Sequence, residues 1–290
     1  MMKVLSLFDG ISCGMVALER AGIPVERYVA YEIEPNAIKI SKKNYPQIEH
    51  CGDVTTADFT QYRGFELLIG GSPCQSLSIV QSQTRQHLDG KSKLFFEFVR
   101  ALEEVKPKYF LFENVASMNN ESKRVISELL GCEPVLIDSG AFCAQERPRL
   151  YWTNIPVVAV CKPSTLVLRD IMQTDAPEKY FYNYPLENID LSKQVCATMV
   201  YKNHDMHKRV FNPNFKCHTL TTCGGGNTQK KVLVNGRARK LTPVEYERLQ
   251  TLPDGYTEGV ADGHRYTAIG NGWTVDVIAH ILKGLKEEQK

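Results

Sequence analysis

The segment Val4-Leu5-Ser6-Leu7-Phe8-Asp9-Gly10-Ile11-Ser12-Cys13-Gly14 begins as an apolar run and ends in a turn that contains two glycines. A short apolar run bounded by a turn is typical of a buried strand, and the residues after Gly14 follow a helical pattern. The two glycines do not form the G-x-G-x-x-G pattern that cradles a pyrophosphate. The segment therefore predicts a strand, a turn and a helix, with a ligand near the turn that carries no phosphate.

Apolar runs and helical stretches alternate over the first 155 residues. The expected strands are Val4–Phe8, Tyr28–Glu32, Leu67–Gly70, Tyr109–Phe112, Val135–Asp138 and Leu150–Thr153. The expected helices are Gly14–Ala21, Asn36–Asn44, Leu94–Val105 and Lys123–Leu130. This alternation predicts an α/β fold with a doubly wound, mostly parallel sheet. Ligands of such sheets bind beyond the carboxyl ends of the strands, so functional residues are expected there.

The alternation stops near Pro156, and the chain becomes rich in Asn, Thr, His and Lys as far as Arg239. We therefore expect a small irregular domain at 156–240 and a larger domain made of 1–155 and 241–290. Helical order returns at Thr242, which is a good N-cap followed by Pro243 and, at the third helical position, Glu245. A final helix is expected at Thr274–Leu285, packed back on the sheet.

The composition bounds the class of protein. The hydrophobic fraction is 43%, which is normal for a chain with a sizeable core. No apolar run is long enough to cross a membrane, and the first residues do not resemble a signal peptide. The nine cysteines have no framework spacing, which favours free thiols in a reducing cytoplasm. We expect a cytoplasmic protein of a bacterium or a phage-infected cell.

The net charge of +2 conceals a strongly basic segment. Between Lys193 and Lys240 the only acidic residue is Asp205, against ten basic ones: Lys193, Lys202, Lys208, Arg209, Lys216, Lys230, Lys231, Arg237, Arg239 and Lys240. An excess of this size is typical of a surface that binds a polyanion, and a solvated basic surface is the alternative. Lys230, Lys231, Arg237 and Arg239 are taken as candidate nucleic-acid contacts.

Three acids, Asp9, Glu32 and Asp53, occur at ordered intervals in the first part of the chain and favour a nucleoside-containing cofactor. Glu32, 18 residues after Gly14, could accept hydrogen bonds from two ribose hydroxyls. Asp53 could accept from an adenine amino group, and Asp9 suits a cationic ammonium group. S-adenosylmethionine has all three groups and no phosphate, and ordinary packing of an α/β turn is the alternative explanation of the turn.

One cysteine stands apart from the other eight. Cys74 follows Gly70-Gly71-Ser72-Pro73, which is poor core material and a good exposed loop, whereas most free cysteines are buried structural residues. Cys74 is therefore the candidate nucleophile. Glu113, at the end of an apolar strand, is the candidate acid, and Gln145-Glu146-Arg147-Pro148-Arg149 supplies cations.

These motifs give the chain a family resemblance. Pro73-Cys74-Gln75, Glu113-Asn114-Val115, Gln145-x-Arg147-x-Arg149 and Gly270-Asn271-Gly272 occur in the order and spacing of the DNA cytosine-5 methyltransferases. The chain resembles their bacterial and phage members over nearly its whole length, while Gly272-Trp273 resembles the animal de novo enzymes. The resemblance implies the class I S-adenosylmethionine-dependent methyltransferase fold with a target-recognition domain.

The resemblance also implies roles for the catalytic residues. Cys74 would add to C6 of cytosine, Glu113 would contact N3, Arg149 would contact O2, and Arg147 would support the site. A methyl group would then pass from S-adenosylmethionine to C5. The segment Gln75–Lys93 would form a loop that closes over the base, and its Ser, Gln and Gly content fits a lid.

Cofactor and DNA contacts follow in the same way. The expected cofactor-binding residues are Phe8, Asp9, Gly10, Gly14, Glu32, Ile33, Asp53, Val54, Pro73, Leu94, Asn271 and Trp273. Trp273 could instead only pack the last helix. Expected DNA contacts, besides the basic residues named above, are Gln75, Ser78, Thr221 and Thr222.

Double-stranded DNA is the expected partner, with the target base turned out of the helix. The recognition region is small, so a short site or one read jointly by two subunits is expected, and monomer and homodimer both remain open. No metal is expected, because His204, His207, Cys217, His218 and Cys223 do not have a known zinc-ligand spacing. The alternatives are a tRNA cytosine-5 methyltransferase, whose Cys-Phe-Thr signature is absent, and a catalytically silent DNA-binding relative.

Overall fold

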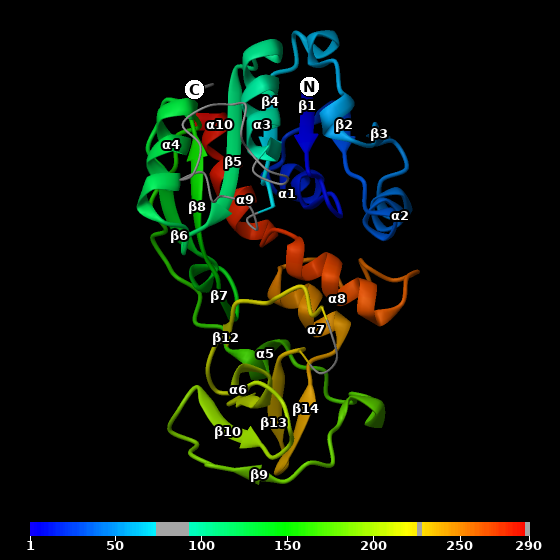
Figure 1. The fold of residues 1–290 in the computed structure, drawn as a ribbon, viewed down its shortest axis with the longest axis vertical. Coiled ribbons are helices and arrows are strands. Elements are labelled where there is room, and N and C mark those ends of the chain that lie inside the picture. The colour runs from blue at the N-terminus through cyan, green and yellow to red at the C-terminus, as the bar shows by residue number, and fades with distance from the viewer. Residues whose placement is uncertain (74–92, 225–227, 288–290) are drawn as a thin grey trace. The chain divides into compact units, whose positions relative to one another are not determined.

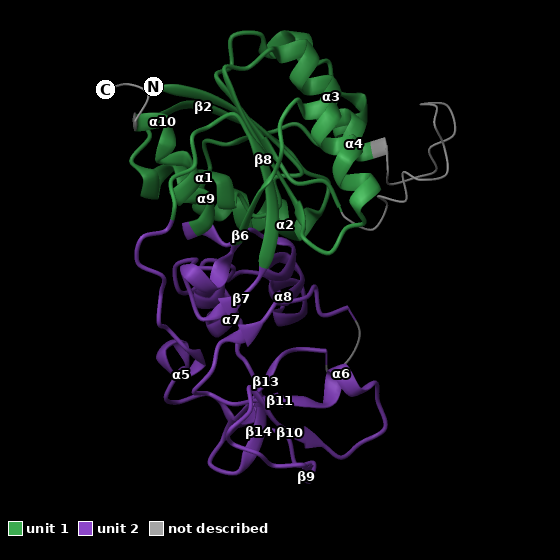
Figure 2. Ribbon diagram, turned by 90° about the vertical axis from the view of Figure 1, so that its left-hand side faces the viewer, with its two compact units in different colours: residues 1–137, 148–159, 277–290 green, residues 138–147, 160–276 purple. Residues whose placement is uncertain are grey.

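The computed structural model describes residues 1–73, 93–224 and 228–287, with the backbone alone for Lys93 and Glu287. The chain forms two compact units (Figure 1, Figure 2). Unit 1 consists of 1–137, 148–159 and 277–290, and unit 2 of 138–147 and 160–276. No helix in the described ranges has the length and apolar character needed to cross a membrane.

Unit 1 is built on a seven-stranded sheet with the order β3-β2-β1-β4-β5-β8-β6. Its strands are β1 (Met2–Leu7), β2 (Val25–Tyr31), β3 (Glu49–His50), β4 (Leu67–Gly70), β5 (Tyr109–Val115), β6 (Val135–Asp138) and β8 (Pro148–Thr153). The first five pair in parallel, and β8 runs antiparallel to β5. The predicted doubly wound, mostly parallel α/β sheet is confirmed.

Helices cover both faces of this sheet. They are α1 (Cys13–Ala21), α2 (Pro35–Asn44), α3 (Lys93–Val105), α4 (Asn120–Leu130), α9 (Val275–Leu282) and α10 (Gly284–Glu287), with short turns η1 (Val54–Thr56) and η2 (Phe59–Tyr62). Figure 2 shows α3 and α4 on one side of the strands and α1 and α9 on the other. This two-sided covering explains why the strands are apolar along both faces.

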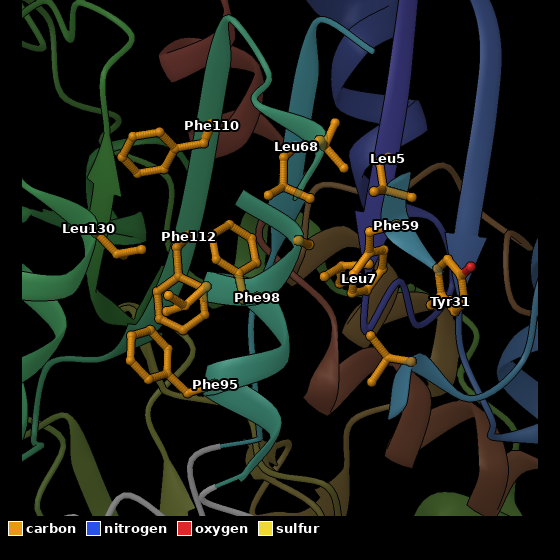
Figure 3. Packing of buried hydrophobic residues seen from close by; sticks show 14 of the residues in the cluster. Leu5, Leu7, Tyr31, Phe59, Leu68, Phe95, Phe98, Phe110, Phe112 and Leu130 are labelled. Carbon is orange, nitrogen blue, oxygen red and sulfur yellow. The ribbon is translucent and has the colours of Figure 1, made fainter. Parts of the chain in front are cut away.

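An aromatic core fills the space beneath α3. Phe95 and Phe98 of α3 contact Phe112 of β5, with ring centroids 5.3 and 4.8 Å apart, and Phe112 in turn contacts Trp152 of β8 (Figure 3). All four side chains are fully buried. Since each buried aromatic side chain contributes several kilocalories per mole to folding, this core holds β5 and β8 rigidly side by side.

Unit 2 contains a five-stranded sheet with the order β14-β13-β11-β10-β9. Its strands are β9 (Leu186–Glu187), β10 (Val195–Met199), β11 (Arg209–Phe211), β13 (Lys231–Val234) and β14 (Arg237–Lys240), and β7 (Gln145–Glu146) pairs separately with β12 (Cys217–His218). Its helices are α5 (Leu168–Ile171), α6 (Asp205–Lys208), α7 (Pro243–Leu249) and α8 (Asp262–Asn271), with turns η6 (Ser139–Ala141) and η7 (Glu178–Tyr180). The region expected to be irregular thus contains an ordered sheet.

The predicted start of α7 is confirmed in detail. The Thr242 hydroxyl accepts a hydrogen bond from Glu245 N, and the Glu245 carboxylate accepts one from Thr242 N. Pro243 occupies the first helical position. This reciprocal capping satisfies two amide donors that a helix start would otherwise leave unpaired.

Two expectations about segments differ from the structure. Residues 241–276, expected with the sheet domain, belong to unit 2, because α7 and α8 share a buried core with β11 and β13. The expected helix Thr274–Leu285 is two helices, α9 and α10, separated at Lys283. Gly284 lies so close to the Pro156 carbonyl oxygen that a Cβ would overlap it, and this contact with a distant segment cannot be foreseen from a local pattern.

Candidate active site

The carboxyl ends of four strands form one row in unit 1. Leu7 of β1 pairs with both Tyr31 of β2 and Gly70 of β4, and Gly70 pairs with Phe112 of β5. The next residues, Phe8, Glu32 and Gly71, therefore leave the sheet at the same level, and Glu113 lies at that level within β5, which continues to Val115. The strand order reverses between β1 and β4, which is the place where open α/β sheets bind ligands.

The turn after β1 has an unusual backbone. Phe8, Gly10 and Ser12 have φ values of 58°, 59° and 60°, in the left-handed region. This conformation is uncommon for residues with a side chain and concentrates at functional sites, where the surrounding structure must hold it. Phe8 is partly buried against the aromatic core, and Gly14 is buried in α1.

The Asp9 carboxylate is what holds this turn. It accepts hydrogen bonds from the hydroxyls of Ser6 (2.6 Å), Ser12 (2.5 Å) and Tyr28 (2.7 Å). Burial, and next the Asp9 charge, raise the pKa of Tyr28 well above its usual value, so the phenol stays a donor. Asp9 therefore holds the turn in this structure, and its contact with a cationic ammonium group stays a prediction.

Glu32 bridges the turn and the end of β2. One carboxylate oxygen accepts from Gly10 N at 2.8 Å, and the other accepts from Ile33 N and Glu34 N, both at 2.8 Å. The neighbouring Ile33 side chain is 68% exposed. Glu32 and Ile33 together present a carboxylate and an apolar surface at the row of strand ends.

The third candidate acid lies at the start of η1. Oδ1 of the exposed Asp53 accepts from both the amide and the hydroxyl of Thr55, at 2.9 Å each. Val54 beside it is buried, and Leu94 is partly buried against the same core. Pro73 is exposed at the end of the described loop after β4. Because both hydrogen bonds from Thr55 go to Oδ1 of Asp53, Oδ2 is the carboxylate oxygen with fewer donors among the described residues.

A close ion pair links the two strands at the edge of the row. Arg149 Nε lies 2.9 Å from Glu113 Oε1, and the two side chains are only 12% and 13% exposed. Antiparallel pairing of β5 and β8 sets Val115 opposite Arg149 and Glu113 opposite Tyr151, which brings both charged groups to one face. The pair is the strongest local concentration of catalytic groups that the sequence predicted and the structure describes.

Asn114 is a site residue whose role was not foreseen. Its side chain is 2% exposed, and Nδ2 donates to the Ser72 carbonyl oxygen at 3.3 Å. It thereby ties the end of β5 to the loop that leads to residue 74. Its place beside Glu113 in the Glu-Asn-Val motif was the available signal. The candidate residues Cys74, Gln75 and Ser78 and the expected lid lie outside the described residues.

Comparison with known proteins decides the family. The sequence profile of the family described as "C-5 cytosine-specific DNA methylase" matches residues 2–151 and 162–287. The chain belongs to this family of C-5 cytosine-specific DNA methylases. It is an enzyme of the DNA (cytosine-5) methyltransferase class, as its motifs predicted.

Named relatives agree with this assignment. The chain is 29% identical to the type II methyltransferase M.Eco47II of Escherichia coli, over 94% of this chain and 76% of that protein. It is 27% identical to the type II methyltransferase M1.ScrFI of Lactococcus lactis subsp. cremoris, over 98% of this chain and 78% of that protein.

Solved structures share the fold. The S. pombe Dnmt2 methyltransferase has a TM-score of 0.75 at 18% identity, and the alignment covers all of both chains. The Entamoeba histolytica methyltransferase EhMeth has a TM-score of 0.75 at 16% identity, covering 100% of this chain and 99% of that one. These likenesses confirm the class I methyltransferase fold.

Arg147 of this methylase has a different environment from Arg149. It lies in unit 2, is 6% exposed, and donates to the carbonyl oxygens of Leu220, Gly270 and Gly272 at 3.0 to 3.2 Å. Its guanidinium thus fastens the segment after β12 to the end of α8. These contacts hold Arg147 within unit 2, and its role in supporting the catalytic site stays a prediction. Asn271 is exposed and Trp273 half-buried in the same unit.

The basic residues of unit 2 separate into three groups. Some are used inside the fold: Lys231 and Arg239 are each 1% exposed, Arg239 pairs with buried Glu245, and Lys216 Nζ donates to three carbonyl oxygens. This corrects the expectation that Lys231 and Arg239 lie on a DNA-binding surface. Others pair with acids on the surface: Lys193 with Asp190, Lys208 with Asp205 and Arg237 with Glu178.

The residues of the third group form no ion pair with the described part of the chain. They are Lys202, Arg209, Lys230 and Lys240. Of the other expected DNA contacts, Thr221 is exposed and Thr222 half-buried. In the described part of the chain, no cluster of three or more His, Cys, Asp or Glu side chains is arranged to hold a metal ion. His218 instead hydrogen-bonds to Gln194 at 2.7 Å.

Proposed function

We propose that this methylase turns a cytosine out of duplex DNA, forms a covalent bond between Cys74 Sγ and C6, and methylates C5. The observation that carries the proposal is the nearly buried Glu113–Arg149 pair, with N and O 2.9 Å apart. It lies in the row of strand ends that also contains Gly71, three residues before Cys74. An acid and a cation held together beside a cysteine loop are what addition to a pyrimidine requires.

The chemistry assigns one task to each of these side chains. C5 of cytosine is too weak a nucleophile to attack a methyl group, so the Cys74 thiolate adds to C6 and an electron pair moves towards N3 and C5. Glu113 at N3 and Arg149 at O2 stabilise the charge that develops on the ring. After methylation a base removes the C5 proton, the electron pair re-forms the C5–C6 double bond, and the thiolate leaves.

The turn after β1 and the acids beside it fit S-adenosylmethionine. Glu32 would hold the ribose hydroxyls, Asp53 Oδ2 the adenine amino group, and exposed Ile33 one face of the adenine. When bound, the cofactor supplies an electrophilic methyl group. The remaining residues of the resemblance, Asn271 and Trp273 included, stay predictions as cofactor contacts.

Duplex DNA is the proposed partner, with residues 156–240 as the target-recognition region. A base within a duplex cannot be reached in place, so it must leave the stack, and basic residues must hold the phosphates meanwhile. The site is a short sequence, read by one copy of the chain or by two.

Methyl transfer from labelled cofactor to duplex DNA, followed by bisulfite sequencing, tests the proposal. Wild type is expected to modify cytosine in a fixed sequence context and to form a covalent complex with DNA containing 5-fluorocytosine, which has no removable proton at C5. Cys74→Ala abolishes both results, Glu113→Gln lowers the rate by about a hundredfold or more, and Cys161→Ala, at an exposed cysteine, changes neither.

A tRNA transcript serves as the competing substrate. Activity confined to that transcript would overturn the DNA assignment, and methylation that persists in Cys74→Ala would overturn the covalent mechanism. A wild-type protein that binds duplex DNA and never modifies it would instead identify a silent relative.

A further inference from the structure

Unit 2 contains a cavity of about 220 Å³ beside β11. It is lined by residues of α6 and β11, by the segment 221–224, and by residues 228–230, which lead into β13. The side chains that matter for its chemistry are Arg209, Lys230, Phe211, Thr221 and Thr222. No Asp or Glu is among its described lining residues.

Two cations meet in this cavity. In the parallel pairing of β11 with β13, Val210 lies opposite Lys231, so the same register places Arg209 beside Lys230. Burial lowers the pKa of Lys230, and the positive charge of Arg209 lowers it further. Two like charges held this close, partly out of water, are unfavourable unless an anion joins them.

Neither cation has an acidic partner among the described residues, although Lys230 Nζ lies over the Phe211 ring. Among the described residues, no hydrogen bond or ion pair is recorded for Lys230 Nζ or for the Arg209 guanidinium. This sets them apart from Lys216, Lys231 and Arg239, whose charges are used by carbonyl oxygens or by Glu245. Two of the four basic residues in the third group, Arg209 and Lys230, therefore line this cavity.

The cavity suits a phosphate group better than a stacked base. Its aromatic residue, Phe211, is only 3% exposed, with Lys230 Nζ 5.6 Å from the ring centroid and His218 packed edge-on at 5.0 Å. No ring face is left for stacking. The hydroxyls of Thr221 and Thr222 add neutral donors to the two cations, which is a typical phosphate environment.

We infer that this cavity binds one phosphodiester of the DNA strand, shared by Arg209 and Lys230. The inference rests on the proposed function, because it takes DNA as the substrate. It assigns to these two residues an anchoring role that holds the strand in place whatever its sequence.

Neutral linkages in the DNA provide the test. A labelled duplex carrying a methylphosphonate at one position at a time is titrated with protein, and binding is followed by fluorescence anisotropy. Wild type is expected to lose about tenfold in affinity at one linkage. Arg209→Gln combined with Lys230→Met is expected to bind the unmodified duplex about tenfold more weakly and to show no further loss at that linkage.

The control is Lys202→Gln, which removes an exposed charge of the same segment and does not line the cavity. It keeps the wild-type sensitivity at that linkage. The salt dependence gives a second readout: the double variant loses about one unit of slope in log affinity against log salt, not two, because one phosphate is shared. Thermal unfolding checks that the variants fold. If Lys230→Met prevents folding, the test uses Arg209→Gln alone, because Arg209 is exposed.

The inference fails if the double variant is still sensitive at every linkage that affects wild type. It also fails if the variants change which sequence is methylated and leave the slope unchanged, since that result identifies a contact to a base. A wild-type protein with no affinity for duplex DNA would overturn the proposed function itself, which is a different outcome.

Discussion

Asp9 illustrates how a side chain at a functional turn can act through the backbone. Its carboxylate is surrounded by three hydroxyl donors, and the turn it closes contains three left-handed residues. Such a backbone persists only where the surroundings hold it. The affinity for a ligand at this turn should therefore depend on donors that never touch the ligand.

Removing one donor tests this role. Tyr28→Phe deletes the 2.7 Å hydrogen bond to Asp9 and leaves the ring in place. A single hydrogen bond of this kind contributes about 1 kcal/mol, so we expect the KM for the cofactor to rise about fivefold while kcat changes little. Steady-state methyl transfer at varied cofactor concentration measures both. Tyr45→Phe, which removes a hydroxyl bonded to Glu19, is the control, and an unchanged KM in Tyr28→Phe would contradict the role.

Lys231 is a buried cation whose charge should destabilise the fold. Its side chain is 1% exposed, and burial lowers its pKa from 10.5 to about 8. Below about pH 8 the residue is charged in both states, and the folded state bears the whole desolvation cost. Between about pH 8 and 10.5 the unfolded chain binds more protons, so the contribution of Lys231 to stability improves as the pH rises.

The variant Lys231→Met should remove that cost. We expect it to raise the free energy of unfolding by about 1 to 3 kcal/mol at pH 7 and by much less near pH 10. Urea denaturation at the two pH values measures the difference, with Lys202→Met as the exposed control. A stabilisation of the same size at both pH values would show that the lysine charge is not its cause.

At the scale of elements, the junction of β14 and α7 is held by one buried ion pair. The Glu245 carboxylate accepts two hydrogen bonds from Arg239, at 2.6 and 2.7 Å, one from Thr242 N and one from Gln173 N. Both charged side chains are essentially unexposed. Glu245, which helps to cap α7, is therefore also the counter-ion that allows the Arg239 guanidinium to be buried.

Breaking and removing this pair should have different effects. Glu245→Gln keeps the size of the side chain and leaves a buried guanidinium uncompensated, so we expect a loss of about 3 to 5 kcal/mol. Arg239→Met combined with Glu245→Gln removes the unpaired charge and should recover much of that loss. Chemical denaturation of the single and double variants measures it. If the double variant is less stable than Glu245→Gln alone, the buried charge is not the main cost.

At the scale of the whole molecule, each unit is assembled from segments far apart in the sequence. Unit 1 combines the first 137 residues with β8 and with a segment after residue 276. That last segment contributes Val277, Ile278, Ile281 and Leu282, all with no exposed surface. The buried core of unit 1 is thus incomplete until this segment, which follows all the strands of its sheet, is present.

Deletion of 277–290 should therefore unfold unit 1. Four fully buried aliphatic side chains contribute about 6 to 12 kcal/mol, which is comparable with the total stability of a domain. We expect the shortened chain to lose its cooperative thermal transition, as followed by circular dichroism. A chain that lacks only 288–290 controls for the shortening itself. A cooperative transition that survives the longer deletion would mean that the sheet is stable without α9.

Local patterns predicted the elements of unit 1 closely. β4 and β6 have the predicted bounds, and α1 and α2 begin one residue before theirs, because their apolar periodicity is contained in a few consecutive residues. The capping box of α7 was equally local. The strands of unit 2 were not predicted. The two-residue strands have no periodicity to detect, whereas β10, β13 and β14 are at least as long as β4 and β6 but lie in a stretch rich in Asn, Thr, His and Lys.

The sequence by itself determined the order of the motifs, the sheet they belong to and the family of the enzyme. Only the tertiary structure decided which charged groups are available. It pairs Glu113 with Arg149 across β5 and β8, turns Asp9 inward, and separates buried Lys231 and Arg239 from Arg209 and Lys230. A charge acts according to its burial and its neighbours, and both depend on residues distant in the chain. A count of basic residues along the sequence therefore predicts a nucleic-acid surface without identifying the residues that would form it.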